Sequence, residues 1–311
     1  MNMNTNPKVS CVMCTYGRYK TVQRSIMTWL EQDYENKELL IFNTAEVPLF
    51  ISDRLQKAGV RVVNQSSKAS GAPFTCLGDV RQAALDHMDG DIYVCWDDDD
   101  FFFPWFLSLG VSKYREHGKW AWKPSEAYMT MDNGVNYKIA GNALEATILV
   151  DADIIKKFGF STNKSGAEHT DGGWMDQCRD HDQLVIEDIY PLESYCYTWG
   201  SPDAPHKTSG HIDEPNNFEN HKSGSVDFGD RVPLDHVDCE FMRRVYKGVL
   251  DMERPSEKDH TALLNKFKEI GYLEGEPAPV EKPTMGYFGS PIPRESIEAM
   301  LGKDNVFWLN G

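Results

Sequence analysis

The segment Ile92-Tyr93-Val94-Cys95-Trp96-Asp97-Asp98-Asp99-Asp100 places five apolar residues directly before four consecutive aspartates. Its β-branched and aromatic residues predict a buried strand. Adjacent carboxylates raise each other's cost of ionisation unless a cation neutralises them. Mg²⁺ and Mn²⁺ prefer carboxylate oxygens and bridge to substrate phosphates. The segment therefore predicts a metal–phosphate site at the end of a strand.

Two simpler explanations of the aspartate run are a solvated acidic turn and a calcium loop. A helix–loop–helix calcium site spreads its ligands over about twelve residues around a central glycine, and the sequence lacks that pattern here. If the backbone of the run is extended, Asp97 and Asp99 point to one side and Asp98 and Asp100 to the other.

Strand and helix patterns alternate along the chain on both sides of this segment. We expect strands at 8–13, 38–42, 60–63 and 146–150, and helices from Thr21, from a cap at Asp79, and over 101–117, 152–158 and 175–184. Such alternation is typical of an α/β fold, a mostly parallel sheet flanked by helices. Ligands of these sheets lie beyond the carboxyl ends of the strands, which is where the aspartates fall.

Charge, hydropathy and cysteine usage exclude some classes of protein. The formal net charge of −16 over 311 residues weakens binding to nucleic-acid backbones. No segment reaches the roughly 18 apolar residues of a transmembrane helix, and residues 1–8 lack a signal-peptide core. We therefore expect no transmembrane segment and a cytoplasmic location. Cys11 and Cys14 have zinc-site spacing but face opposite sides of an expected strand, so we expect structural cysteines there.

Two further motifs precede the aspartate run. Val9-Ser10-Cys11-Val12-Met13-Cys14-Thr15-Tyr16-Gly17-Arg18 is a strand that ends in a polar loop, and Gly78-Asp79-Val80-Arg81-Gln82-Ala83-Ala84 opens a helix. Pro104 follows the run by four residues. In this order the motifs resemble those of a GT-A glycosyltransferase of the family 2 type. The resemblance covers about residues 8–210, and it implies a GT-A-like domain over 1–230, with 231–311 as a C-terminal, mostly helical extension.

The resemblance implies a metal-dependent enzyme that uses Mn²⁺ or Mg²⁺. Such an enzyme moves a sugar from a nucleoside diphosphate sugar, by default a UDP-sugar, to an acceptor hydroxyl with inversion. A nucleotidyltransferase acting on sugar phosphates, or a non-catalytic nucleotide-sugar-binding module, stays open as an alternative. The sequence does not indicate the acceptor, which could be a saccharide, a lipid-linked glycan, a protein or a modified nucleic-acid base.

The resemblance also assigns roles to single residues. Asp99 would ligate the metal, Asp97 would hold the ribose or base side of the nucleotide, and Asp100 would position the sugar or the metal. Arg81 would bind phosphate or buttress the aspartates. The other donor-binding residues would be Asp98 in the run and, against the base and its ribose, Thr15, Tyr16 and Arg18.

One position departs from the family pattern. Members commonly carry an aspartate after the second strand that touches the base, whereas this chain has Asn43-Thr44. Asn43 could still hydrogen-bond a base edge through its amide.

The catalytic base and two further contacts fall later in the chain. An acceptor hydroxyl must lose its proton as it attacks, and the candidates are Asp171, favoured by its loop position, and Asp176, whose pKa a helix N-terminus would depress. By the resemblance, His206 could complete the metal shell. Trp174 and Trp199 are the candidate sugar platforms.

Overall fold

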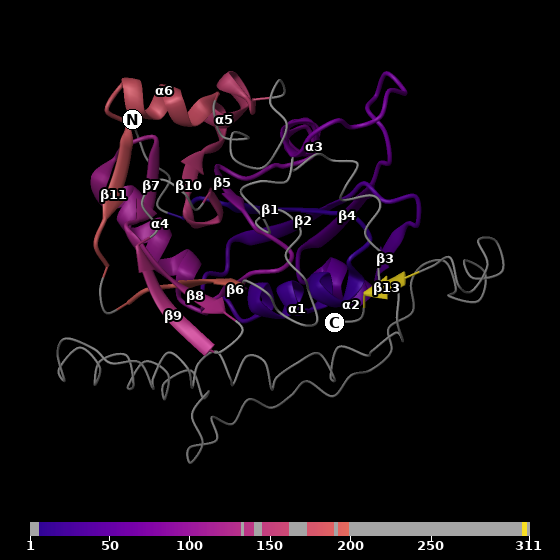
Figure 1. Cartoon of the computed structure of the whole chain (residues 1–311), viewed down its shortest axis with the longest axis horizontal. Coiled ribbons are helices and arrows are strands. Elements are labelled where there is room, and N and C mark those ends of the chain that lie inside the picture. Colours follow the sequence, from indigo (N-terminus) through magenta and orange to yellow (C-terminus); the bar gives the residue numbers. More distant parts are fainter. Residues whose placement is uncertain are drawn as a thin grey trace, which may run out of the picture.

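The computed structural model describes residues 6–131, 134–139, 145–161, 173–189, 192–198 and 307–309. A seven-stranded sheet lies at its centre, with strands in the order β11-β7-β10-β5-β1-β2-β4 (Figure 1). These strands are β1 (Val9–Thr15), β2 (Lys37–Asn43), β4 (Val60–Asn64), β5 (Ile92–Cys95), β7 (Ala121–Pro124), β10 (Leu149–Asp151) and β11 (Leu184–Glu187). Within this sheet only β10 runs antiparallel to its neighbours. The predicted α/β fold with a mostly parallel sheet is confirmed.

Helices cover both faces of the central sheet. One buried cluster includes side chains of α1 (Tyr19–Leu30) and α4 (Phe106–His117); the other includes those of α3 (Leu77–Leu85), α5 (Ala152–Phe158) and α6 (Trp174–Asp180). In Figure 1, α3, α5 and α6 lie above the sheet and α1 below it. A short helix, α2 (Asp53–Lys57), and a 3-10 turn, η1 (Glu145–Thr147), are also present.

Two expected helix starts are wrong. α3 begins at Leu77 with Cys76 as its N-cap, and Asp79 lies in the first turn. There it accepts hydrogen bonds from the backbone N–H and the hydroxyl of Thr75, at 3.0 and 2.6 Å. The helix expected from residue 101 begins at Phe106, because Phe101–Phe102 instead forms β6 and pairs with β12, a strand from much later in the chain.

Two smaller sheets flank the central one. The first has the order β6-β12-β8-β9 and contains β12 (Tyr195–Thr198), β8 (Glu126–Met131) and β9 (Gly134–Ile139). The second pairs β3 (Leu49–Ile51) in parallel with β13 (Phe307–Leu309). β13 is the described part of the predicted C-terminal extension; the rest of 231–311 lies outside the described residues. No helix in the described ranges is long and apolar enough to cross a bilayer.

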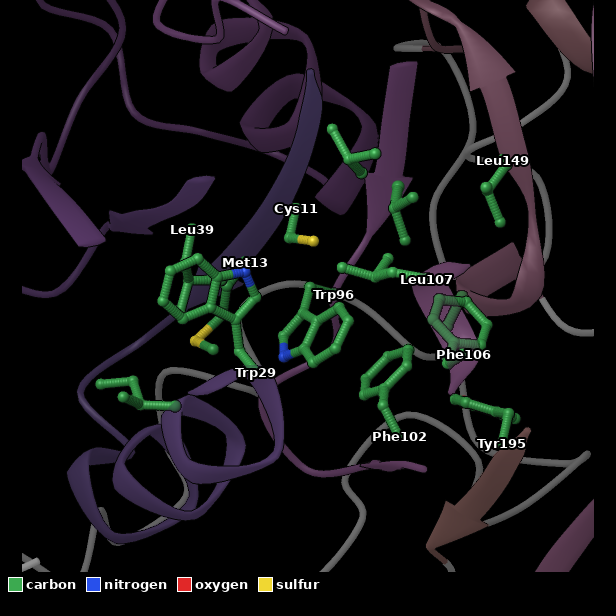
Figure 2. Close-up of a cluster of buried hydrophobic side chains, with 14 of the residues drawn as sticks. Cys11, Met13, Trp29, Leu39, Trp96, Phe102, Phe106, Leu107, Leu149 and Tyr195 are labelled. Atoms are coloured by element: carbon green, nitrogen blue, oxygen red, sulfur yellow. The ribbon is translucent and has the colours of Figure 1, made fainter. Parts of the chain in front are cut away.

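Aromatic packing fixes both ends of the aspartate run. Trp96 precedes the run and Phe102 follows it, and their rings stack with centroids 3.7 Å apart. Tyr195 packs edge-on against Phe102 at 5.1 Å. Figure 2 shows these side chains in one buried cluster with Trp29 and Phe106. Because Trp96 and Phe102 are fully buried, separating them would expose a large apolar area, and the ends of the run are held together.

The two cysteines with zinc-site spacing belong to different layers. Cys11 is fully buried in the cluster that contains α1, whereas Cys14 is half-buried and packs against the opposite cluster. This is the strand geometry that the sequence predicted. Burial raises the pKa of the Cys14 thiol to about 12, so this free thiol is protonated near neutral pH.

Candidate active site

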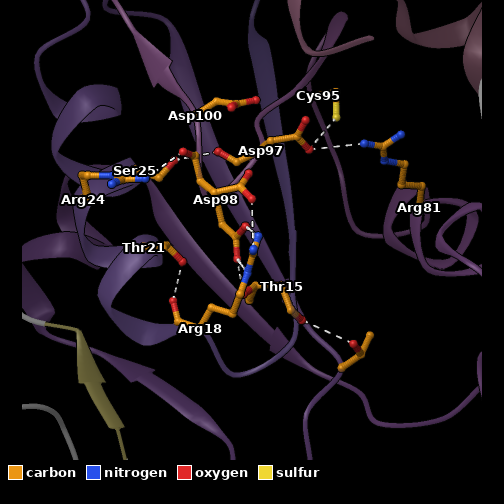
Figure 3. Close-up of polar contacts among 12 residues, drawn as sticks. Thr15, Arg18, Thr21, Arg24, Ser25, Arg81, Cys95, Asp97, Asp98 and Asp100 are labelled. Carbon is orange, nitrogen blue, oxygen red and sulfur yellow. Dashed lines mark hydrogen bonds and ion pairs between the residues drawn. The ribbon is translucent and has the colours of Figure 1, made fainter. Parts of the chain in front are cut away.

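The aspartate run bends at the carboxyl end of β5, beside the end of β1 (Figure 3). Two side chains of α1 hold its backbone: Arg24 Nη2 donates to the Asp99 carbonyl at 2.7 Å, and Ser25 Oγ donates to the Asp97 carbonyl at 3.0 Å. The expected alternation of side chains is therefore wrong, because β5 ends before the run begins. The adjacent carboxylates of Asp98 and Asp99 contact one guanidinium group instead.

That guanidinium group belongs to Arg18. Its Nη1 lies 2.9 Å from Asp99 Oδ2, its Nε lies 3.1 Å from Asp98 Oδ2, and its Nη2 pairs with Asp98 Oδ1. Thr15, the last residue of β1, donates its hydroxyl to Asp98 Oδ2 at 2.6 Å. Burial raises the pKa of the Asp98 carboxyl, and Arg18 counteracts part of that rise. Burial also disfavours the charged form of Arg18, but the two carboxylates outweigh it and raise the pKa of the guanidinium.

A second arginine holds the first aspartate of the run. Arg81 lies on α3, and its buried guanidinium donates to Asp97 Oδ1 at 3.2 Å and pairs with Glu145 of η1. Burial opposes ionisation of Arg81, but the surrounding acidic groups, Glu145 and Asp97 among them, raise its pKa well above the ordinary value. The Asp97 side chain keeps 35% of its surface exposed, so this carboxylate stays accessible while Arg81 orients it.

The last aspartate of the run, Asp100, is held by a residue of one of the smaller sheets. Asp100 is buried and accepts a hydrogen bond from the hydroxyl of Tyr195 on β12. Burial and the neighbouring carboxylate raise the pKa of this hydroxyl well above its usual value, so it stays a donor. Sequence reasoning missed both Tyr195 and Glu145. The only local signal was an acidic residue before the apolar segment 146–150.

A pocket of about 280 Å³ opens beside the ends of β1 and β2. Its lining combines two aromatic side chains, three aliphatic hydroxyl groups and one carboxylate, from Tyr16, Thr44, Glu46, Ser66, Ser67, Gly71, Pro73 and Phe74. The backbone N–H of Thr44 donates to the Thr15 carbonyl at 3.0 Å, which ties this pocket to the strand end that also carries the Thr15–Asp98 contact. The predicted donor residues Thr15, Tyr16 and Arg18 therefore lie together with the aspartate run.

Asn43 lies at the end of β2 and is fully buried. Its amide donates to the Val47 carbonyl and to Asn64 Oδ1, both at 2.9 Å, and its oxygen accepts from Ala45 N at 3.2 Å. In this structure Asn43 therefore braces the loop that supplies Thr44 and Glu46 to the pocket.

The predicted residues from later in the chain are only partly described. Asp176 lies in the first turn of α6, where its exposed carboxylate pairs with Arg179 at 3.4 Å. Asp171, His206 and Trp199 lie outside the described residues. The expectation that Trp174 is an open sugar platform is wrong: it begins α6, is fully buried, and packs edge-on to Phe160 at 6.4 Å.

The side chains of the run fit a hard divalent cation by their chemistry, because carboxylate oxygens are the ligands it prefers. In the present arrangement these oxygens contact Arg18 and Arg81. Among the described residues no group of three His, Cys, Asp or Glu side chains is arranged to hold an ion. A cation that bound either oxygen of Asp98, or Asp99 Oδ2, would therefore have to displace Arg18.

Comparisons with known proteins agree with this geometry. Residues 10–123 match the family model described as glycosyl transferase family 2. A putative glycosyltransferase, EpsE of Bacillus subtilis, is 29% identical over 125 residues, which are 37% of this chain and 41% of EpsE. The chain thus spans less than half the length of that curated relative.

Among solved structures, S. aureus TarS in complex with UDP-GlcNAc has a TM-score of 0.50 at 15% identity, covering 85% of this chain and 72% of TarS residues 1–349. A mannosyltransferase of Pyrobaculum calidifontis, solved with GDP-Man and Mn²⁺, has a TM-score of 0.44 at 14% identity, covering 86% and 68%. The matched residues 10–123 contain all of β1 except Val9, as well as Arg18, Arg81 and the whole aspartate run. Residues 10–123 are thus similar to the glycosyl transferase family 2 domain, and the chain has a GT-A-like α/β fold.

Proposed function

We propose that this protein is a glycosyltransferase that moves a sugar from a nucleoside diphosphate sugar to an acceptor hydroxyl. One observation carries the proposal: Thr15 and Arg18 meet the bent aspartate run at the carboxyl end of the central strands, beside the pocket lined by Tyr16 and Thr44. An acidic run next to a pocket with stacking and hydroxyl groups suits a ligand that combines a base, a ribose and a diphosphate. TarS, which shares the fold, is solved with a ligand of this class.

In this proposal the Tyr16 pocket takes the nucleoside. Tyr16 offers a ring for stacking on the base, while Thr44, Ser66 and Ser67 offer hydroxyls for its edge and for the ribose. A uridine nucleotide is the default. Asp97, exposed and oriented by Arg81, would hold the ribose side of the donor.

Asp99 would hold the divalent cation, Mn²⁺ or Mg²⁺, with His206 as a further ligand. When bound, the cation would supply Lewis-acid neutralisation of the leaving diphosphate. The chain's own contribution is to keep these carboxylates in place. Arg81 orients Asp97, and Tyr195 orients Asp100, so little reorganisation is needed as charge develops on the leaving group.

The acceptor hydroxyl needs a base on the other side of the sugar. Asp171 or Asp176 would take its proton, and direct attack would invert the anomeric centre. The exposed Asp176 carboxylate is open to an acceptor from solvent.

Replacement of Tyr16 tests the nucleoside pocket. We expect Tyr16→Ala to weaken UDP binding about tenfold, because base–aromatic stacking is worth ~1–3 kcal/mol, whereas Tyr16→Phe keeps the ring and should bind like the wild type. Isothermal titration with UDP in the presence of Mn²⁺ measures both variants. Equal affinities for Tyr16→Ala and the wild type would place the base elsewhere.

Measuring which phosphate-containing product is released tests the proposed reaction. The protein would be incubated with UDP- and GDP-sugars and Mn²⁺, with a panel of saccharide acceptors, and both nucleoside diphosphate and pyrophosphate would be measured. Release of nucleoside diphosphate supports glycosyl transfer. In a parallel incubation with sugar phosphates, nucleoside triphosphates and Mn²⁺, formation of pyrophosphate would identify a nucleotidyltransferase. Tight donor binding without either product would identify a binding module.

A further inference from the structure

Arg18 occupies the side of the aspartate run that a cation would need. Its guanidinium contacts both oxygens of Asp98 and one oxygen of Asp99. A divalent ion cannot share these lone pairs with a guanidinium group, and the two positive charges repel each other. Binding of a cation to these three oxygens and binding of Arg18 to them are therefore mutually exclusive.

The two carboxylates need a positive charge at all times. Asp98 and Asp99 are only 1% and 5% exposed, and burying adjacent carboxylates without a counter-charge is strongly unfavourable. In the structure Arg18 supplies that charge. A cation that displaced Arg18 would supply it in turn, so the pair would remain neutralised throughout the exchange.

The surroundings of Arg18 allow its side chain to move away from the two carboxylates, whereas other contacts hold the aspartate run in place. Arg18 lies directly before α1 and follows Gly17, whose φ of 69° is in the left-handed region, and a quarter of its side chain is exposed. The run keeps other attachments: Thr15 holds Asp98, and Arg24 holds the Asp99 carbonyl. Departure of Arg18 would therefore leave the backbone of the run in place.

We propose that Arg18 is a built-in counter-ion of Asp98 and Asp99, that a divalent cation displaces it, and that the displaced guanidinium then pairs with the donor diphosphate. This inference rests on the proposed function. Arg18 follows the pocket residue Tyr16 by two positions, so its guanidinium can swing between the run and a diphosphate extending from that pocket. The exchange makes cation and nucleotide binding cooperative, because the diphosphate gives the displaced guanidinium a new partner.

Mn²⁺ binding in the absence and presence of UDP tests the exchange. Free Mn²⁺ would be followed by electron paramagnetic resonance during titration of the full chain. We expect wild-type protein to bind Mn²⁺ about tenfold more tightly with saturating UDP than without it. Arg18→Gln removes the competing charge, so it should bind Mn²⁺ alone about tenfold more tightly than the wild type, and UDP should add little further affinity.

Two variants separate this effect from general charge and folding effects. Arg115→Gln removes the same charge from an exposed position on α4 and should titrate like the wild type. Arg18→Lys keeps the charge but cannot bridge two carboxylates. It should give an intermediate Mn²⁺ affinity, and it serves as the test variant if Arg18→Gln does not fold.

The outcomes distinguish the exchange from the proposed function. If UDP promotes Mn²⁺ binding in the wild type but Arg18→Gln and Arg18→Lys bind Mn²⁺ alone no more tightly than the wild type, Arg18 is a fixed structural ion pair and the exchange is overturned. If no variant binds Mn²⁺ even with UDP, the cation site of the proposed function itself is wrong.

Discussion

Asp99→Asn is expected to lower kcat for sugar transfer by about a thousandfold, which corresponds to ~4 kcal/mol of transition-state stabilisation. Asparagine keeps the shape of the side chain and its contact with Arg18 Nη1, which lies 2.9 Å from Asp99 Oδ2, but it loses the negative charge that a divalent cation requires. A bound metal ion contributes several kcal/mol by neutralising a leaving group. The effect should appear in kcat, measured from nucleoside diphosphate release at saturating donor.

Two comparisons make this result specific. Asp182→Asn changes an exposed aspartate that pairs with Lys119 at 2.9 Å, and its activity should equal that of the wild type. Treatment of the wild type with a chelator should reproduce the loss, and added Mn²⁺ should restore the wild type but not Asp99→Asn. Turnover by Asp99→Asn that persists in the presence of chelator would show that the leaving diphosphate is stabilised without a cation at this residue.

The sequence predicted those parts of the fold in which the residue pattern of a single segment determines which side chains are buried. β1, β2 and β5 are short apolar runs, and α5 has the bounds that the sequence predicted, with Asp151 as its N-cap and Gly159 as its C-cap. In each case the pattern within one segment decides both the element and its buried face. The central sheet order places β5, β1 and β2 side by side, so the predicted donor residues at and just after the ends of these strands converge, and Arg81 joins them from α3.

The parts that sequence could not predict depend on distant segments. The sequence around Phe101 and Phe102 is compatible with the start of a helix and with a strand. These residues form a strand because they pair with β12, which comes much later in the chain. The Tyr195–Asp100 contact likewise joins residues 95 positions apart. The prediction that Trp174 is an open sugar platform failed for a related reason. Its burial against Phe160 depends on how α6 packs, and the polar residues next to Trp174 in the sequence do not indicate that packing.

Contacts between residues far apart in the sequence hold several predicted site residues in position. Sequence motifs predicted residues that would face the donor, and Glu145 and Tyr195 hold two of these, Arg81 and Asp100, from elements later in the chain. The run is therefore anchored from α1, α3 and β12 together, and η1 holds the Arg81 side chain of α3. A change in any of these elements can disturb the carboxylates without touching a ligand.

The Arg81–Glu145 pair provides the sharpest test of that support. Arg81→Met is expected to lower the free energy of unfolding by ~3–5 kcal/mol, because removing one partner of a buried ion pair leaves the other buried without its counter-charge. The side chains of Arg81 and Glu145 are only 6% and 13% exposed, so water replaces the lost contact poorly. Urea unfolding followed by circular dichroism, with linear extrapolation, measures the change.

A double-mutant cycle shows whether the loss comes from this pair. Adding Glu145→Gln to Arg81→Met removes the buried negative charge and should recover ~1–3 kcal/mol of the loss, whereas independent sites would give additive losses. Arg179→Met is the matched control, because its partner Asp176 is 60% exposed and a surface pair contributes only ~0–1 kcal/mol. Strict additivity of Arg81→Met and Glu145→Gln would mean that Arg81 is stabilised by other contacts and that Glu145 does not orient it toward Asp97.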